Sequence, residues 1–128
     1  MRLLRGVLPG VCVVILAFLA SAAPFDRWIE FTQPGGAVVR IHGSGDEFSA
    51  RFETAEGYTV VFDKALRAYC YARQDTTSGG LVSTGVPAHE PAPADLQPGV
   101  RMSVSARQAM IAERYETWEA GMQTRPRW

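Results

Sequence analysis

Between residues 29 and 85, hydrophobic side chains come in short runs separated by residues that favour turns. The runs occupy residues 38–41, 48–54, 58–62, 68–72 and 81–82. They are rich in β-branched and aromatic side chains, which favour extended strands. Gly57 lies in a tight connection where glycine can take a positive φ. No long helical pattern separates the runs, which disfavours a parallel sheet. The pattern predicts a mainly β fold over residues 23–86, a small antiparallel meander or half-barrel of four to six strands.

Residues 87–102 are rich in proline and alanine. Proline lacks a backbone donor and stiffens the chain. We therefore expect this segment to form an extended spacer outside the core.

Residues 103–122 have the spacing of an amphipathic helix, followed by a short tail at 123–128. Ser105 and Gln108 can form a capping box at its start, and Gly121 suits its end. Apolar side chains recur along one side, at Ile111, Tyr115, Trp118 and Met122. We expect this stripe to pack on the β-rich module or on a neighbouring domain, which makes Ile111, Tyr115 and Trp118 candidate partner contacts. The polar face is mixed to acidic, unlike the basic face of a membrane-surface helix.

The N-terminus has the order of a secretory signal peptide. Arg2 and Arg5 precede an apolar run at residues 7–20, and small residues follow. We predict cleavage after Ala22, which makes residues 1–22 the signal peptide and the mature chain secreted or extracytoplasmic. An uncleaved anchor is disfavoured, because a spanning helix wants about 20 apolar residues and Pro9-Gly10 interrupts this run. After cleavage we expect no stable membrane insertion.

Composition and charge exclude several classes of protein. The hydrophobic fraction of 47% is too high for a disordered chain. Thirteen basic and thirteen acidic residues give a net charge of zero, which cleavage lowers to about −2. A nucleic-acid partner is therefore not expected, since such binders are basic. Cys70 would be the one cysteine of the mature chain. We expect it to be a small buried hydrophobic residue, the alternatives being a reactive thiol or pairing between chains.

Candidate catalytic and metal-binding residues are few. His89-Glu90 begins like a zinc-protease motif, but Pro93 stands where H-E-x-x-H needs its second histidine. His42 precedes a glycine turn at the expected end of a strand and is expected to be a surface or turn residue. Asp46 is expected to cap a turn beside a solvated Glu47, because adjacent carboxylates on a strand point apart. We therefore expect no enzyme activity, no metal and no cofactor.

Three elements of the β-rich region nevertheless occur in a distinctive order. They are Gly45-Asp46-Glu47-Phe48, then Glu53-Thr54 with Gly57-Tyr58, then Tyr71-Ala72. With these elements the chain resembles the N-terminal region of secreted M6-family metalloproteases, the immune-inhibitor-A-like enzymes. In that family the region lies between the signal peptide and the zinc catalytic domain. The resemblance covers a little over half of the mature chain.

The chain also departs from the family pattern. Gly35 stands where the family commonly has Asp, and Cys70 replaces a larger residue. The family's H-E-x-x-H-x-x-G zinc helix does not occur in these 128 residues, so no catalytic or metal-binding residue is carried over. The resemblance implies a non-catalytic, prodomain-like module that assists folding of, or masks, an M6-type catalytic domain. The alternatives are an independent extracytoplasmic protein-binding module and a truncated fragment of an M6 precursor.

Overall fold

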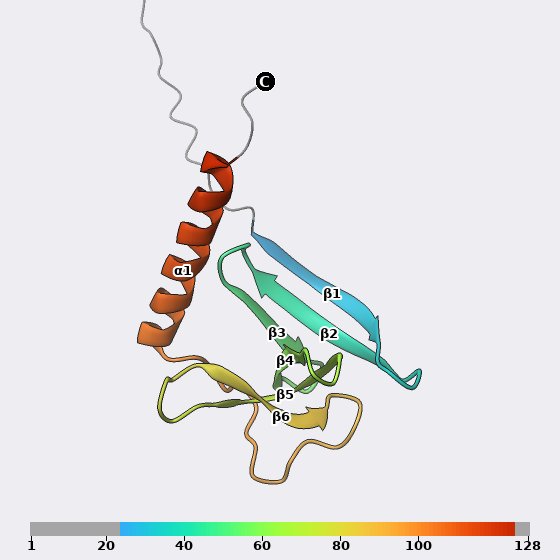
Figure 1. Ribbon diagram of the computed structural model, residues 1–128. Coiled ribbons are helices and arrows are strands. Elements are labelled where there is room, and N and C mark those ends of the chain that lie inside the picture. The colour runs from blue at the N-terminus through green and yellow to red at the C-terminus, as the bar shows by residue number, and fades with distance from the viewer. Residues whose placement is uncertain (1–23, 125–128) are drawn as a thin grey trace, which may run out of the picture.

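The structure, a computed structural model, describes residues 24–124 and consists of six strands followed by one helix (Figure 1). The elements are β1 (Phe25–Thr32), β2 (Val38–Gly45), β3 (Ala50–Thr54), β4 (Thr59–Asp63), β5 (Ala68–Gln74), β6 (Leu81–Pro87) and α1 (Val104–Gln123). The mainly β fold with a C-terminal helix is confirmed. The signal peptide predicted at residues 1–22 lies outside the described residues.

The six strands form one antiparallel sheet in which each strand pairs with its neighbour in the sequence. β1 and β2 form the longest hairpin, with eight paired positions between Phe25 and Gly45. Figure 1 shows that the sheet curls after β3, so that β5 and β6 run across the direction of β1 and β2. This order is the meander that the alternation of strand and turn signals predicted.

The hydrophobic core lies on the face of the sheet that the curl encloses. Its buried side chains come from β2, β4, β5 and the segment after β6: Val39, Ile41, Val60, Tyr71 and Leu96. Partly buried aromatic rings extend it, and the rings of Phe31 and Tyr69 meet edge to face at 4.9 Å. β2 shows why the sequence forms a strand here: Val39 and Ile41 are buried while Val38 and Arg40 are exposed, which is the two-residue period of a sheet.

A buried glutamine joins the two ends of the sheet. Gln33, in the β1–β2 turn, donates from Nε2 to the Tyr69 carbonyl at 2.8 Å and accepts from the Tyr69 N–H at 2.9 Å. The side-chain amide therefore satisfies both backbone groups of one β5 residue, as a neighbouring strand would. Because a buried polar group without partners is costly, this pairing explains how Gln33 can be almost completely buried.

The expectation that residues 87–102 form a spacer outside the core was wrong. Leu96 is 5% exposed and belongs to the buried cluster, and Val100 packs against that cluster. Tyr71 Oη donates to the Glu90 carbonyl at 2.7 Å, and the Gly99 N–H donates to the Gly57 carbonyl at 3.0 Å. The prolines prevent regular pairing but leave side chains and carbonyls free to pack. We call residues 88–102 the strap.

Cys70 is confirmed as a buried residue. It lies in β5 with no exposed surface and forms no disulfide. Burial raises the pKa of its thiol above the ordinary value. Both properties oppose the thiolate form on which cysteine reactivity depends.

The bounds of the helix agree with the prediction to within one residue, but its capping residue differs. Ser103, not Ser105, is the N-cap, and its Oγ accepts from the Ala106 N–H at 3.1 Å. A contact with a distant part of the chain explains why Ser103 is the cap: its N–H donates to the Gly79 carbonyl in the β5–β6 turn at 2.8 Å. At the other end α1 continues through Gly121, and Thr124 is the C-cap.

The strap generates a first prediction. Leu96→Ala should lower the free energy of unfolding by about 2–5 kcal/mol, because it removes a buried side chain and leaves a cavity. Leu66→Ala is the matched control, since Leu66 is 46% exposed and surface substitutions change stability by less than about 0.5 kcal/mol. Urea unfolding followed by circular dichroism measures both. Equal effects of the two variants would place the strap outside the core.

A second prediction concerns acid. Arg73 Nη1 lies 2.8 Å from Asp95 Oδ2, tying β5 to the strap, and this hydrogen bond lowers the pKa of Asp95 from its ordinary 3.8. A carboxyl whose pKa is lower in the folded chain contributes stability above the ordinary value and loses it as pH falls through the folded value. The midpoint temperature of thermal unfolding should therefore decrease as the pH is lowered from neutral to about 3. Asp95→Asn should make that decrease smaller. A decrease of the same size in the variant and the wild type would show that the ion pair contributes nothing to stability.

Candidate partner-binding face

The turn between β2 and β3 is built by the first element of the family resemblance. Asp46 Oδ1 accepts from the N–H groups of Phe48 at 2.9 Å and Ser49 at 2.8 Å. Asp46 therefore caps the turn, as predicted, and Glu47 is exposed. Gly45 has φ +123°, and a Cβ there would lie 2.1 Å from the Ser49 carbonyl oxygen. Only glycine fits that position without a shift of the backbone.

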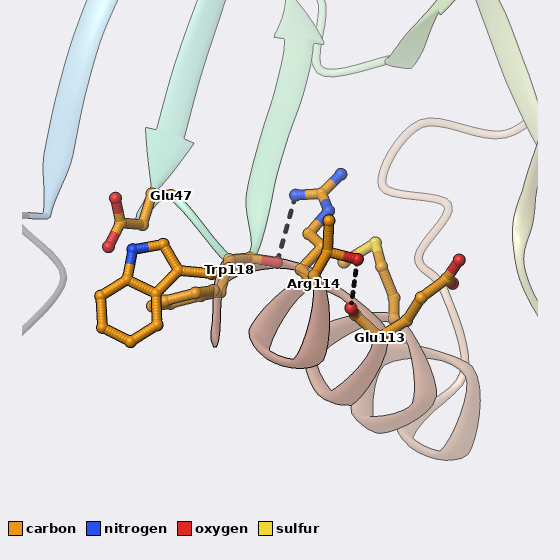
Figure 2. A pocket seen from close by; sticks show the side chains of 7 residues that line it. Glu47, Glu113, Arg114 and Trp118 are labelled. Carbon is orange, nitrogen blue, oxygen red and sulfur yellow. Dashed lines mark hydrogen bonds between the residues drawn. The ribbon is translucent and has the colours of Figure 1, made fainter. Parts of the chain in front are cut away.

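The helix α1 stands beside this turn and is held to it by two arginines. Arg107 Nε donates to Ser49 Oγ at 3.1 Å, and Arg114 Nη1 donates to the Phe48 carbonyl at 3.1 Å. Arg107 and Arg114 are seven residues apart, which places them on the same side of a helix. Figure 2 shows Arg114 reaching from the helix to the end of the strands. Arg107 lies four residues before Ile111 and Arg114 three residues after it, so the docking of α1 rests on polar contacts from residues that border the apolar stripe.

The apolar stripe of α1 is about half-exposed among the described residues, so the β-rich module covers it only in part, and packing on a neighbouring domain stays a prediction. Tyr115 is 47% exposed, Trp118 42% and Met122 49%. Only Ile111, nearest the start of the stripe, is partly buried. No residue of α1 is buried within the part of the chain that the structure describes.

Three aromatic side chains nevertheless form a continuous ridge, which we call the aromatic ridge. The Phe48 ring lies 6.1 Å from the Tyr115 ring, and the Tyr115 ring lies 5.8 Å from that of Trp118. The structure thus brings together Phe48 from the family motif and two candidate contacts of the helix. Sequence reasoning named these residues separately and missed their proximity, which depends on where α1 docks.

A hollow of about 430 Å³ lies between the β2–β3 turn and α1. Figure 2 shows the Trp118 indole and the Glu47 carboxylate at one end of it, Glu113 toward the other and Arg114 between them. A concave surface with one large aromatic wall and charges of both signs is suited to contact a polypeptide.

The remaining motif residues lie elsewhere and have structural roles. In the β3–β4 turn, Thr54 Oγ1 accepts from the Tyr58 N–H at 3.2 Å, and Gly57 has the predicted positive φ of +87°. The Tyr58 and Tyr71 rings meet edge to face at 5.7 Å. Two further motif residues complete this set: Glu53, which forms an ion pair with Arg51, and Ala72, which is buried in β5.

The histidines do not form a catalytic arrangement with each other. His42 lies within β2, not at a strand end, because β2 continues to Gly45. Its Nε2 is 2.6 Å from Asp26 Oδ1, and its ring lies 5.0 Å from that of Trp28. Sequence reasoning missed this pair, because β1 begins before the region recognised as strands. His89 is exposed after β6.

Between residues 24 and 124 there is no group of three or more His, Cys, Asp or Glu side chains that could hold a metal ion. Over the same stretch, no helix has both the length and the apolar character needed to span a bilayer.

The turn generates a third prediction. Gly45→Ala should lower the free energy of unfolding by about 2 kcal/mol or more, since it combines backbone strain with a clash. Gly85→Ala is the matched control, because Gly85 also has a positive φ, +77°, but open space around it. That variant should cost about 1–2 kcal/mol. Urea unfolding compares the two, and a Gly45→Ala cost below that of Gly85→Ala would contradict the close approach of Ser49.

Comparisons of the chain with protein-family models, with curated proteins and with solved structures find no match. The relation to M6-family metalloproteases therefore stays a prediction from the motif residues. What the geometry adds is the position of those residues: the first motif forms the turn beside α1, and the other two lie in the β3–β4 turn and in β5.

Proposed function

We propose that this chain is a secreted, non-catalytic module that binds the catalytic domain of an M6-type metalloprotease and assists its folding or masks it. The aromatic ridge of Phe48, Tyr115 and Trp118 is the contact surface in this proposal.

The observation that carries the proposal is the way in which α1 is held. Arg107 and Arg114 fix the helix to the β2–β3 turn, which leaves the apolar stripe half-exposed beside a hollow. Tyrosine and tryptophan are enriched among the residues that dominate binding energy at protein interfaces. A helix that buried its stripe in its own core would have no such surface to offer.

The M6 partner is supported by the residues of the resemblance. Gly45 and Asp46 shape the turn, and Phe48 contributes both a carbonyl to Arg114 and a ring to the ridge. In this proposal, the motif that resembles the protease family is therefore the platform for the binding surface.

A second candidate is an independent extracytoplasmic protein-binding module, and the edge of the sheet favours it. β1 pairs with β2 alone, over eight regular positions, and it contains no proline. Such an edge can accept an extended segment of another chain by strand addition.

The fourth prediction tests the ridge. Residues 23–128 should bind an M6 catalytic domain encoded in the same genome, measured by isothermal titration calorimetry. Trp118→Ala should weaken that binding at least tenfold, because truncating an interface tryptophan can cost ~2 kcal/mol or more. Glu116→Ala is the control, since a position two residues from both Arg114 and Trp118 lies on another side of the helix.

The outcomes separate the two candidates. Absence of binding between two folded partners would remove the protease proposal and leave the independent module. Equal affinities of wild type and Trp118→Ala would remove the ridge as the contact and favour the β1 edge. Circular dichroism of each variant confirms that the sheet is intact.

A further inference from the structure

A second hollow lies nearer the start of α1, and none of the three side chains of the aromatic ridge lines it. Its volume is about 440 Å³, within the usual range for sites that bind small molecules. Its walls come from four separate parts of the fold: the end of β2 with the start of β3, the first residue of β6, the end of the strap and the first turns of α1. Met110 lines both hollows, so the two are neighbours along α1.

Most of the lining is apolar, and its charges are all positive. Leu81, Met102 and Met110 are among the apolar lining residues. The charged ones are Arg51, Arg101 and Arg107, and no aspartate or glutamate lines this hollow. An apolar cavity with a few charged groups of one sign is the usual composition of a site for a small amphipathic ligand.

The three arginines are incompletely neutralised by the rest of the described chain. Within residues 24–124, Arg101 and Arg107 form no ion pair, and the side-chain bond of Arg107 is to the neutral Ser49 hydroxyl. Arg51 Nε lies 2.9 Å from Glu53 Oε1 as an ion pair, yet this buried donor has no hydrogen bond of good geometry in the described residues. A buried donor left without an acceptor raises the free energy of the folded state.

We propose that this hollow binds a small organic anion that carries one carboxylate on an apolar body. The carboxylate accepts from the arginines, which match it in charge and in fork geometry. The apolar body packs against Leu81, Met102 and Met110. This site is separate from the aromatic ridge and does not depend on a protease partner.

The test uses octanoate as the probe and the methionine methyl groups as reporters. Residues 23–128 are labelled at the methionine methyls and titrated with octanoate by NMR. We expect saturable shifts of Met102 and Met110, which line the hollow. Met122, near the far end of α1, should not move. Octanol, with the same body and no charge, should bind about tenfold more weakly, because hydrogen bonds to charged groups are the stronger ones.

Variants of the arginines test which side chains bind the carboxylate of octanoate. Arg101→Gln and Arg107→Gln should each weaken octanoate binding several-fold, whereas Arg27→Gln, on the exposed surface of β1, should leave it unchanged. Because Arg107 also holds α1, Arg101→Gln is the decisive variant, and circular dichroism checks the fold of each.

Four results would overturn the proposal. Equal affinity for octanoate and octanol would show a merely apolar hollow. Octanoate affinity unchanged by both Arg101→Gln and Arg107→Gln would remove the arginines as its ligands. Shifts of Met122 equal to those of Met102, or no saturable shift at all, would show that octanoate does not occupy this site.

Discussion

A single β-sheet cannot bury its hydrophobic residues alone, and the rest of this structure depends on how that constraint is met. Small domains are stable when two layers enclose one core. Here the sheet curls upon itself, and the strap supplies the remaining cover through Leu96 and Val100. The strap is fixed by backbone and side-chain hydrogen bonds, among them that of Tyr71 Oη to the Glu90 carbonyl. A segment without regular structure therefore acts as the second layer of the domain.

The path of the strap also sets the position of the helix. The strap follows β6, crosses β4 and β5, and leads into Ser103. The Ser103 N–H donates a hydrogen bond to the Gly79 carbonyl. That contact selects the residue that caps α1 and directs the helix toward the β2–β3 turn. The aromatic ridge and the arginine-lined hollow both depend on where α1 starts. Each is formed by side chains of the helix together with residues of the sheet and its turns.

Local patterns predicted β2 to β6 but not β1, because the side-chain period of a strand and its turn residues are properties of neighbouring positions. The burial of Cys70 and the turn-capping role of Asp46 followed from the same information. The strap could not be recognised, because proline-rich sequence carries no period that reveals packing. The polar docking of α1 was also missed, since the apolar stripe gave no sign that two arginines beside it would hold the helix. The polar contacts of Arg107 and Arg114 depend on a loop more than fifty residues away.

The weak attachment of α1 has a functional consequence. A neutral hydrogen bond contributes a net of about 0.5–1.5 kcal/mol to stability, and one from a charged donor somewhat more. Besides the contact of Ser103 with Gly79, two hydrogen bonds from charged arginines and one aromatic contact hold α1, while the sheet is stabilised by its own core and the strap. The buried core therefore does not depend on α1, because none of the residues of the helix belongs to the buried cluster. A partner that covers the stripe gains apolar contact area at small cost to the module. This separation between a stable sheet and a loosely attached aromatic helix is the physical basis on which a binding function is proposed.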